Sequence, residues 1–202
     1  RYTHDPKKLA ANVAKHGVWF HEAHGFEWGT AIIKADSRHQ YGEARFEAMG
    51  LIGERLYVLV FILRETAVRI ISLRKANSRE VNGMPQQFIK TKSGRLIALP
   101  NAQEDATINA AVASDADSPE WTEADFASAQ PASDFFDPAT RAKLSALQRK
   151  PGERGPQKAP TKVSTTIRLS PDVVAAFKAT GAGWQTRMDA ALKDWLKTHS
   201  PA

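Results

Sequence analysis

Seven cationic side chains recur along residues 45–79, a stretch whose short apolar runs predict strands. They are Arg45, Arg55, Arg64, Arg69, Arg74, Lys75 and Arg79. Guanidinium groups bind phosphate oxygens through paired, charge-assisted hydrogen bonds, and they stabilise negative charge that develops on a phosphate during its transfer. This pattern indicates a surface that holds a nucleic-acid backbone. For any one of these arginines, a solvated position on a strand face is an equal alternative.

Other residue types with catalytic potential are sparse. The chain has no cysteine, which excludes disulfides, thiolate zinc sites and cysteine nucleophiles. Its histidines show no metal-ligand spacing and it has no glycine-rich phosphate loop, so we expect neither a metal ion nor a cofactor. His16 directly precedes Gly17 at the end of a predicted helix and is expected to cap that helix. Trp19 and Phe20 are expected in the core.

The elements that must position these cations form a compact α+β unit in residues 1–83. Asp5 and Pro6 predict the start of a helix that ends at Gly17, and Asn77 is expected to cap a last short helix. Strands are predicted over residues 30–35, 43–50, 55–64 and 68–74. Helices followed by a meander of strands predict an antiparallel sheet with helices packed on it.

Charge is distributed unevenly along the chain. Residues 1–83 carry 13 Lys and Arg against 9 Asp and Glu, and residues 151–202 carry 8 against 4, so each part has a balance of +4. Residues 101–138 hold nine acidic residues and no Lys or Arg. Two basic parts around an acidic middle predict two polyanion-binding units and a segment that can lie on one of them. An acidic linker that simply stays solvated is the alternative.

The middle of the chain is predicted to be partly extended. Residues 84–117 are expected to form a hairpin and then a flexible linker rich in Ala, Asp and Ser. Residues 118–150 regain aromatic character and end in a predicted helix over residues 138–148. We expect this segment to mask the basic unit through aromatic anchors ringed by carboxylates, before a basic Pro- and Gly-rich linker at 151–161. The anchors are Trp121, Phe126, Phe135 and Phe136.

Residues 162–202 show the pattern of a strand followed by two helices. Apolar and polar residues alternate strictly over residues 162–169, Ser170 and Pro171 begin a helix, and Trp184 begins a second one. A lone strand leaves both edges unpaired, so pairing with a second copy predicts a ribbon-helix-helix dimer whose ribbon enters a DNA major groove. An amphipathic unit that only dimerises is the alternative. The expected DNA contacts are Lys162, Ser164, Thr166, Arg168, Gly183, Gln185, Thr186 and Arg187.

Blocks in both halves resemble known families. The C-terminal half resembles the BrnA antitoxins in SPEWTEADFASAQPASDFF at 118–136 and in SPDVVAAFKATGAGWQTRMDAALKDWL at 170–196. The N-terminal half resembles the BrnT toxins, members of the RelE-like fold, in DPKKLAANVAKHGVWFHEA at 5–23, DSRHQYGEARFEAMG at 36–50 and VRIISLRKANSRE at 68–80. The resemblance implies a type II toxin-antitoxin system: a metal-independent endoribonuclease that cuts messenger RNA, and a DNA-binding antitoxin that represses its own operon.

The implied reaction is attack of a ribose 2′-hydroxyl on the adjacent phosphate, which needs a base, a cation at the phosphate and an acid. The residues in the matching positions are Glu43 or His39 as the base, Arg64 and Arg74 as phosphate clamp and charge stabiliser, Arg79 and Lys75 as assisting cations, and Arg45 and Arg69 as RNA contacts. One departure from the family is Leu63, where members often carry an acidic residue just before the arginine matched by Arg64.

The partners expected from these interpretations are an RNA substrate, operator DNA and a second copy of the chain, joined through residues 162–199 into an assembly of two toxin and two antitoxin units. No apolar run approaches the ~18–20 residues of a membrane span and no leader peptide is recognisable, so we expect a cytoplasmic protein without a membrane partner. Met84 could instead begin a separate antitoxin polypeptide. The competing interpretation is a non-enzymatic, two-headed transcription factor whose N-terminal part binds a partner.

Overall fold

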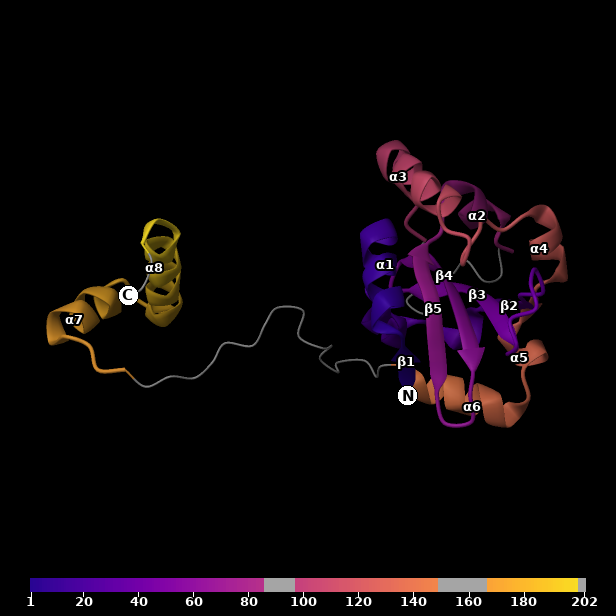
Figure 1. The fold of residues 1–202 in the computed structure, drawn as a ribbon, viewed down its shortest axis with the longest axis horizontal. Coiled ribbons are helices and arrows are strands. Elements are labelled where there is room, and N and C mark those ends of the chain that lie inside the picture. Colours follow the sequence, from indigo (N-terminus) through magenta and orange to yellow (C-terminus); the bar gives the residue numbers. More distant parts are fainter. Residues whose placement is uncertain (86–96, 149–166, 200–202) are drawn as a thin grey trace. The chain divides into compact units, whose positions relative to one another are not determined.

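The computed structural model describes residues 1–85, 97–148 and 167–199. The chain divides into two units, residues 1–156 and 157–202, and each is described by itself (Figure 1). Most of the hairpin predicted within residues 84–100 lies outside the described residues. The same holds for most of the strand predicted over residues 162–169.

The first unit contains a central sheet with helices on both faces (Figure 1). Its elements are β1 (Tyr2–His4), α1 (Pro6–His16), η1 (Phe20–Gly25), η2 (Trp28–Thr30), β2 (Ile32–Ala35), β3 (Arg45–Ile52), β4 (Arg55–Leu63), β5 (Val68–Lys75), α2 (Ser78–Gly83), α3 (Ala102–Ala113), α4 (Glu123–Ser128), β6 (Gln130–Pro131), α5 (Ala132–Phe135) and α6 (Pro138–Leu147). The prediction of an α+β unit is confirmed.

The first helix begins and ends where the sequence predicts. The Asp5 side chain accepts a hydrogen bond from the Lys7 amide at 2.7 Å, and Pro6 occupies the first helical turn. Gly17 ends the helix with a φ of 65°, a left-handed conformation that favours glycine, and its amide donates to the Val13 carbonyl. Asn77 caps α2 as predicted, because its side chain accepts from the Glu80 amide at 2.8 Å.

The sheet has the strand order β1-β5-β4-β3-β2-β6. Neighbouring strands are antiparallel except β1 and β5, which are parallel, so the expectation of a purely antiparallel sheet is wrong at this edge. Three residues are too few for a recognisable alternation, and the sequence gives no sign of β1. Beyond β1, the buried Asn12 side chain covers the β5 edge: its amide donates to the Leu73 carbonyl at 2.8 Å and accepts from the Leu73 amide at 3.0 Å.

Alternating side chains of the sheet serve two separate cores. Along β4, Tyr57, Leu59 and Phe61 lie in one cluster, whereas Leu56 and Val58 lie in another on the opposite face. We call the second face the polar face because it also carries buried polar and charged residues. Those on the strands themselves are Lys34, Arg45, Glu47, Ser72 and Arg74.

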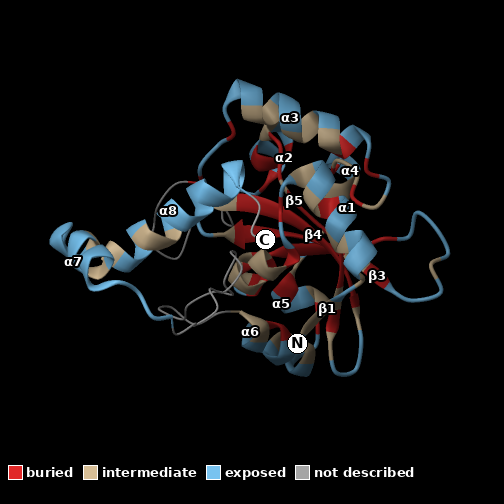
Figure 2. Cartoon of the chain, turned by 60° about the vertical axis from the view of Figure 1, so that its left-hand side comes forward, coloured by how far each residue is buried: buried red, intermediate tan, exposed pale blue. Residues whose placement is uncertain are grey.

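Residues 97–148, which we call the cover segment, contact both faces of the sheet. Trp121 belongs to the core of the polar face, and Phe136 and Leu144 belong to the core of the opposite face. Between them, β6 pairs with β2 and extends the sheet by one strand. Figure 2 shows the buried strands enclosed by helices whose outer sides are exposed. The cover segment therefore wraps around the β2 edge.

Helix α3 replaces the flexible linker that the sequence predicts over residues 101–117, and that expectation is wrong. The Asn101 side chain accepts from the Glu104 amide at 2.9 Å and caps the helix. Glu104 pairs with Lys75 at 2.8 Å, and Asp105 accepts from the Ser78 amide at 2.6 Å. Contacts with the basic unit thus order an Ala-rich stretch that has little apolar surface of its own to bury.

The second unit contains α7 (Pro171–Ala179) and α8 (Trp184–Thr198), which begin where the sequence predicts. Ser170 precedes α7 but makes no side-chain cap, contrary to expectation. Neither helix contains a buried residue (Figure 2). Their exposed large apolar side chains are Val173, Leu192, Trp195 and Leu196. Among the described residues, no helix is long and apolar enough to cross a membrane.

Candidate functional site

The centre of the polar face is a buried ion pair between Arg74 on β5 and Glu80 on α2. The guanidinium donates from Nη1 to Glu80 Oε2 at 2.8 Å and from Nη2 to Oε1 at 2.7 Å, and the two side chains are 1% and 0% exposed. Glu80 also accepts from the Asn77 amide, which completes the capping box of α2. The pair is therefore fixed by the start of the helix that follows β5.

The cover segment supplies further hydrogen-bond acceptors to the Arg74 guanidinium. Its Nε donates to the carbonyl and the hydroxyl of Ser118, both at 3.0 Å, and Nη2 donates to the Pro119 carbonyl at 2.6 Å. The Trp121 amide in turn donates to Glu80 at 3.0 Å. Arg79, which is otherwise exposed, pairs with Glu120 at 2.8 Å. Of the sequence-predicted site residues, Arg74 is thus buried beneath residues 118–119, and Arg79 forms an exposed ion pair with residue 120.

Next to this pair, Asp115 lies among donors from α1 and β5. His16 Nε2 lies 2.9 Å from Asp115 Oδ2, Lys15 Nζ donates to Oδ1 at 2.9 Å, and the Ser72 hydroxyl lies 3.3 Å from Oδ2. Burial raises the pKa of Asp115, but the hydrogen bonds from His16 and Lys15 outweigh it and hold the pKa well below its usual value. The expectation that His16 caps α1 is wrong, because its ring contacts Asp115 and Gly17 ends the helix.

Asp117 contacts a second group of cations. Its carboxylate pairs with Lys8 and lies 3.3 Å from Arg45 Nη1, and its carbonyl accepts from Arg45 and Arg38. Arg45 is 6% exposed, and its Nε lies 3.0 Å from Asp36. The predicted RNA contact Arg45 is therefore covered like Arg74.

Further along the polar face, the cover segment meets Lys34 and the buried Glu47. Lys34 Nζ lies 3.3 Å from Glu47 and 2.8 Å from Asp125, and 5.3 Å from the centre of the Trp121 ring. Burial raises the pKa of Glu47 even though Lys34 and Arg38 favour its charged form. At the end of the sheet, Glu104 lies 2.8 Å from Lys75 and 3.1 Å from Arg55, which are paired with Tyr57 and Ile52 and alternate away from the polar face.

The predicted catalytic residues do not form one site. Arg74 pairs with Val58 in the sheet, whereas Arg64 follows the other end of β4, six residues or about 20 Å away. Arg64 pairs with Glu43 at 3.0 Å, and both side chains are roughly half exposed. His39 lies in the same exposed loop as Glu43, near Tyr41. The structure therefore separates an exposed Arg64–Glu43 group from the covered Arg74 group, and Arg64 and Arg74 cannot clamp the same phosphate.

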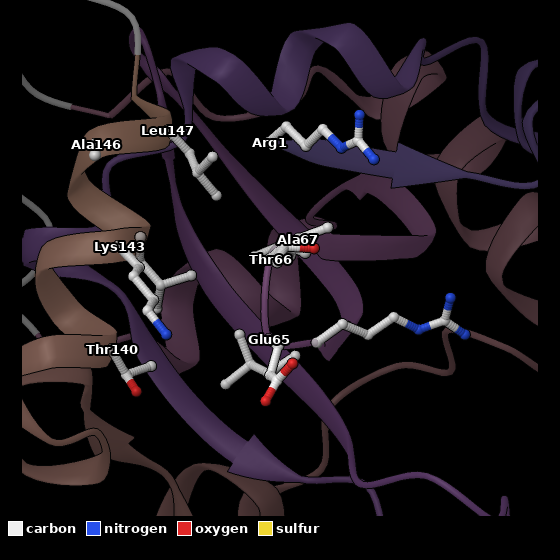
Figure 3. Close-up of a pocket in the computed structure, with 12 residues that line it drawn as sticks. Arg1, Glu65, Thr66, Ala67, Thr140, Lys143, Ala146 and Leu147 are labelled. Atoms are coloured by element: carbon white, nitrogen blue, oxygen red, sulfur yellow. The ribbon is translucent and has the colours of Figure 1, made fainter.

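The remaining predicted RNA contact, Arg69, lies at the Arg64 end of the sheet. Arg69 is half-buried on β5, opposite Ile62. Leu63, the residue before Arg64, packs against the core. A hollow of about 440 Å³ opens nearby between the β4–β5 turn and α6, and Figure 3 shows Lys143 and Glu65 on opposite sides of it.

The four aromatic anchors of the predicted masking segment divide between the two faces. Trp121 and Phe126 pack together on the polar face, with ring centroids 5.4 Å apart. The Phe126 ring also lies against Gly83 so closely that a Cβ there would come within 2.7 Å of it. Phe135 and Phe136 pack on Phe46 over the opposite face. The masking segment thus holds the sheet from both sides.

In the second unit, the structure describes some of the residues that are predicted to contact DNA, and others lie outside the described residues. Lys162, Ser164 and Thr166 lie outside the described residues, and Arg168 precedes α7 in an exposed position. The Arg187 guanidinium donates to the carbonyls of residues 180–182, so it holds the turn between the helices rather than extending freely. Gly183 begins α8 with a φ of 82°, and its carbonyl accepts from the Thr186 amide, which is therefore not free for a phosphate. Gln185 lies in the first turn of α8.

Lys8, Lys15, His16, Ser72 and Lys34 were not predicted as site residues. A sequence signal exists for the first two, because Lys8, Asn12 and Lys15 recur at spacings of four and three and share one face of α1. Among the described residues, no group of three or more His, Cys, Asp or Glu could hold a metal ion.

Two protein families match this chain, each over a different range of residues. Residues 4–80 match the family described as the ribonuclease toxin, BrnT, of type II toxin-antitoxin systems. Residues 117–196 match the family described as the BrnA antitoxin of type II toxin-antitoxin systems. No match was found among curated individual proteins.

Proposed function

The chain joins a BrnT toxin segment, residues 4–80, to a BrnA antitoxin segment, residues 117–196, and we propose that the first is an endoribonuclease whose RNA-binding surface the second covers. The contact that carries this proposal is the one on Arg74, which is wholly buried beneath Ser118 and Pro119. A basic surface that is closed by acidic residues of an antitoxin segment is a surface from which RNA is excluded.

The active surface in this proposal is the polar face and not the Arg64 end of the sheet. Arg74, Arg79, Lys75 and Arg45 are the predicted cations that the cover segment contacts. They would hold the RNA backbone and stabilise charge on the phosphate while the 2′-hydroxyl attacks it. The Arg64–Glu43 pair stays exposed with the cover in place, so a reaction there would not be masked by these contacts.

We propose a RelE-like fold for the toxin unit and a ribbon-helix-helix dimer for residues 162–199. The dimer is supported by the second unit itself, whose two helices bury no residue and expose Leu192, Trp195 and Leu196. Two amphipathic helices of this size cannot bury a core alone, and a second copy would cover their apolar sides. The resulting assembly of two toxin and two antitoxin units would bind operator DNA and repress its own operon, with Arg168 reading base edges.

Lifting the cover from the polar face tests the ribonuclease. In the full chain, Glu120→Lys with Trp121→Ala places a cation beside Arg79 and removes the anchor of the polar-face core, while Phe136 still holds the opposite face. This lifted variant should cleave RNA in the presence of a chelator, whereas the unchanged chain should not. The matched control is Asp134→Lys, an exposed acid of the same segment whose carboxylate accepts a hydrogen bond from the neighbouring Ser133 hydroxyl and forms no ion pair among the described residues.

A lifted variant that is folded and exposes its polar face but leaves RNA intact would favour the competing interpretation, a non-enzymatic transcription factor with a partner-binding domain. For the DNA half, Arg168→Ala should lower sequence preference in a gel-shift titration more than overall binding. If the preference for the operator sequence is unchanged by this substitution, Arg168 does not read base edges.

A further inference from the structure

Helix α1 directs cations at the polar face, and these cations meet two aspartates of the cover segment. Lys8, Asn12 and Lys15 share the face of α1 that contacts the sheet, where Asn12 bonds to β5. Among the described residues, Lys8, Lys15 and His16 form ion pairs with Asp115 and Asp117 alone. The toxin segment thus supplies cations here, and the antitoxin segment supplies their counter-charges.

The first of the two contacts surrounds one carboxylate with three polar side chains. Lys15, His16 and Ser72 approach the Asp115 carboxylate from two elements at 2.9, 2.9 and 3.3 Å. The His16 side chain is 2% exposed and that of Asp115 is 5% exposed. A tetrahedral phosphate oxyanion needs the same set of donors around it, since it too is bound by several convergent hydrogen bonds and a positive charge.

The second contact repeats the arrangement two residues further along the cover segment. Asp117 pairs with Lys8 and with Arg45, which is 6% exposed. Both aspartates lie in one turn, in which the Ser118 amide donates to the Asp115 carbonyl at 3.2 Å. The turn therefore presents two carboxylates, two residues apart in the chain, to two neighbouring groups of cations.

We infer that Lys15, His16 and Ser72 bind one phosphate of a single-stranded RNA, that Lys8 and Arg45 bind the neighbouring phosphate, and that Asp115 and Asp117 occupy these two sites in the covered state. The inference rests on the proposed function, and it assigns the substrate track on the toxin surface. A cavity of about 300 Å³ beside the first site continues this surface, and it is lined by Lys15, His16, Arg74 and Lys75 together with residues of α3.

A non-cleavable probe tests the inference apart from catalysis. The probe is a 2′-O-methyl oligoribonucleotide, which lacks the attacking hydroxyl, and binding is measured by fluorescence anisotropy over a range of salt concentrations. The full chain with Asp115→Asn and Asp117→Asn should bind the probe, as should the lifted variant. In the lifted variant, Lys8→Ala and Lys15→Ala should each weaken binding about tenfold and reduce the salt slope by about 0.7.

The matched control is Lys7→Ala, which removes an exposed lysine adjacent to Lys8 and should change neither affinity nor slope. Inorganic phosphate at equal ionic strength should compete far more weakly than the oligonucleotide, because it fills one site only. The inference is overturned if neither the Asp115→Asn, Asp117→Asn chain nor the lifted variant binds the probe. It is also overturned if Lys8→Ala and Lys15→Ala leave the affinity unchanged.

The outcomes separate the inference from the proposed function. If probe binding depends on Lys8 and Lys15 but natural RNA is not cleaved, the inferred phosphate sites are supported and the proposed ribonuclease activity is contradicted. If the lifted variant cleaves RNA and Lys8→Ala and Lys15→Ala do not change the cleavage rate, the proposed ribonuclease activity is supported and the inferred phosphate sites are contradicted.

Discussion

Glu80 accepts two hydrogen bonds from Arg74, at 2.7 and 2.8 Å, and through the same carboxylate it also accepts from the amides of Asn77 and Trp121. One side chain therefore links the strand β5, the start of α2 and the cover segment. Because both members of the pair are buried, neither can lose its partner without leaving a charge away from water.

Glu80→Gln should destabilise the full chain by about 3–5 kcal/mol, because the buried Arg74 keeps its charge and loses its counter-ion. Thermal or denaturant unfolding measures the change. Glu43→Gln is the matched control: it breaks the half-exposed pair with Arg64 and should cost about 0–1 kcal/mol. Equal effects of the two substitutions would contradict the special position of the Arg74–Glu80 pair.

Phe136→Ala should destabilise the toxin unit itself by about 3–5 kcal/mol, because Phe136 is part of the same core as Trp28 and Phe61. Phe135→Ala, one residue away and only partly buried, should cost clearly less. Hydrogen exchange of β3 and β4 should rise in the first variant and stay nearly unchanged in the second. A toxin sheet that remains fully protected without Phe136 would show that the cover segment does not share its core.

Acid should loosen the cover at Asp115. The pKa of this carboxyl is lowered in the folded chain, so its contribution to stability is complete above its ordinary pKa of about 4 and is lost as the pH falls below that value. Asp115→Asn should remove this part of the acid-side slope when unfolding is followed from neutral pH downward. Asp134→Asn, in an exposed position, should leave the slope as it is. A slope that is the same in all three proteins would contradict the prediction.

Leu192→Asp should convert the full chain from a dimer to a monomer in sedimentation velocity, because Leu192 is 54% exposed on the apolar side of α8 and a charge there opposes association. Lys193→Ala, at the next position, should leave the dimer intact. A wild-type chain that sediments as a monomer would remove the ribbon-helix-helix proposal, and DNA binding should be lost together with the dimer.

The sequence predicts the elements whose signals are local. Asp5, Pro6 and Gly17 determine α1 within a dozen residues, and a continuous apolar run over residues 56–63 is sufficient to place β4. Helix α3 was missed because its residues are Ala-rich and polar, and its order depends on Lys75 and Ser78 of the toxin segment.

The site could be predicted only in part, for the same reason. Arg74 and Arg79 were recognised from their residue type, but the distance between Arg74 and Arg64 follows from strand register, which spacing along the chain does not give. His16 was assigned to a helix end because its partner, Asp115, lies about a hundred residues later. A side-chain contact between two segments far apart in the chain produces no periodic pattern in the sequence of either segment.

Because the cover segment packs on both faces of the sheet, the ways in which it can leave the sheet are limited. Since β6 extends the sheet at β2 while Trp121 and Phe136 are inserted on opposite sides of it, no single rigid movement frees all three. Departure has to proceed by peeling, one side before the other, with a half-open state between. In that order of events, the side that opens first decides whether the polar face is uncovered while the opposite core is still intact, or whether that core opens before the polar face is uncovered.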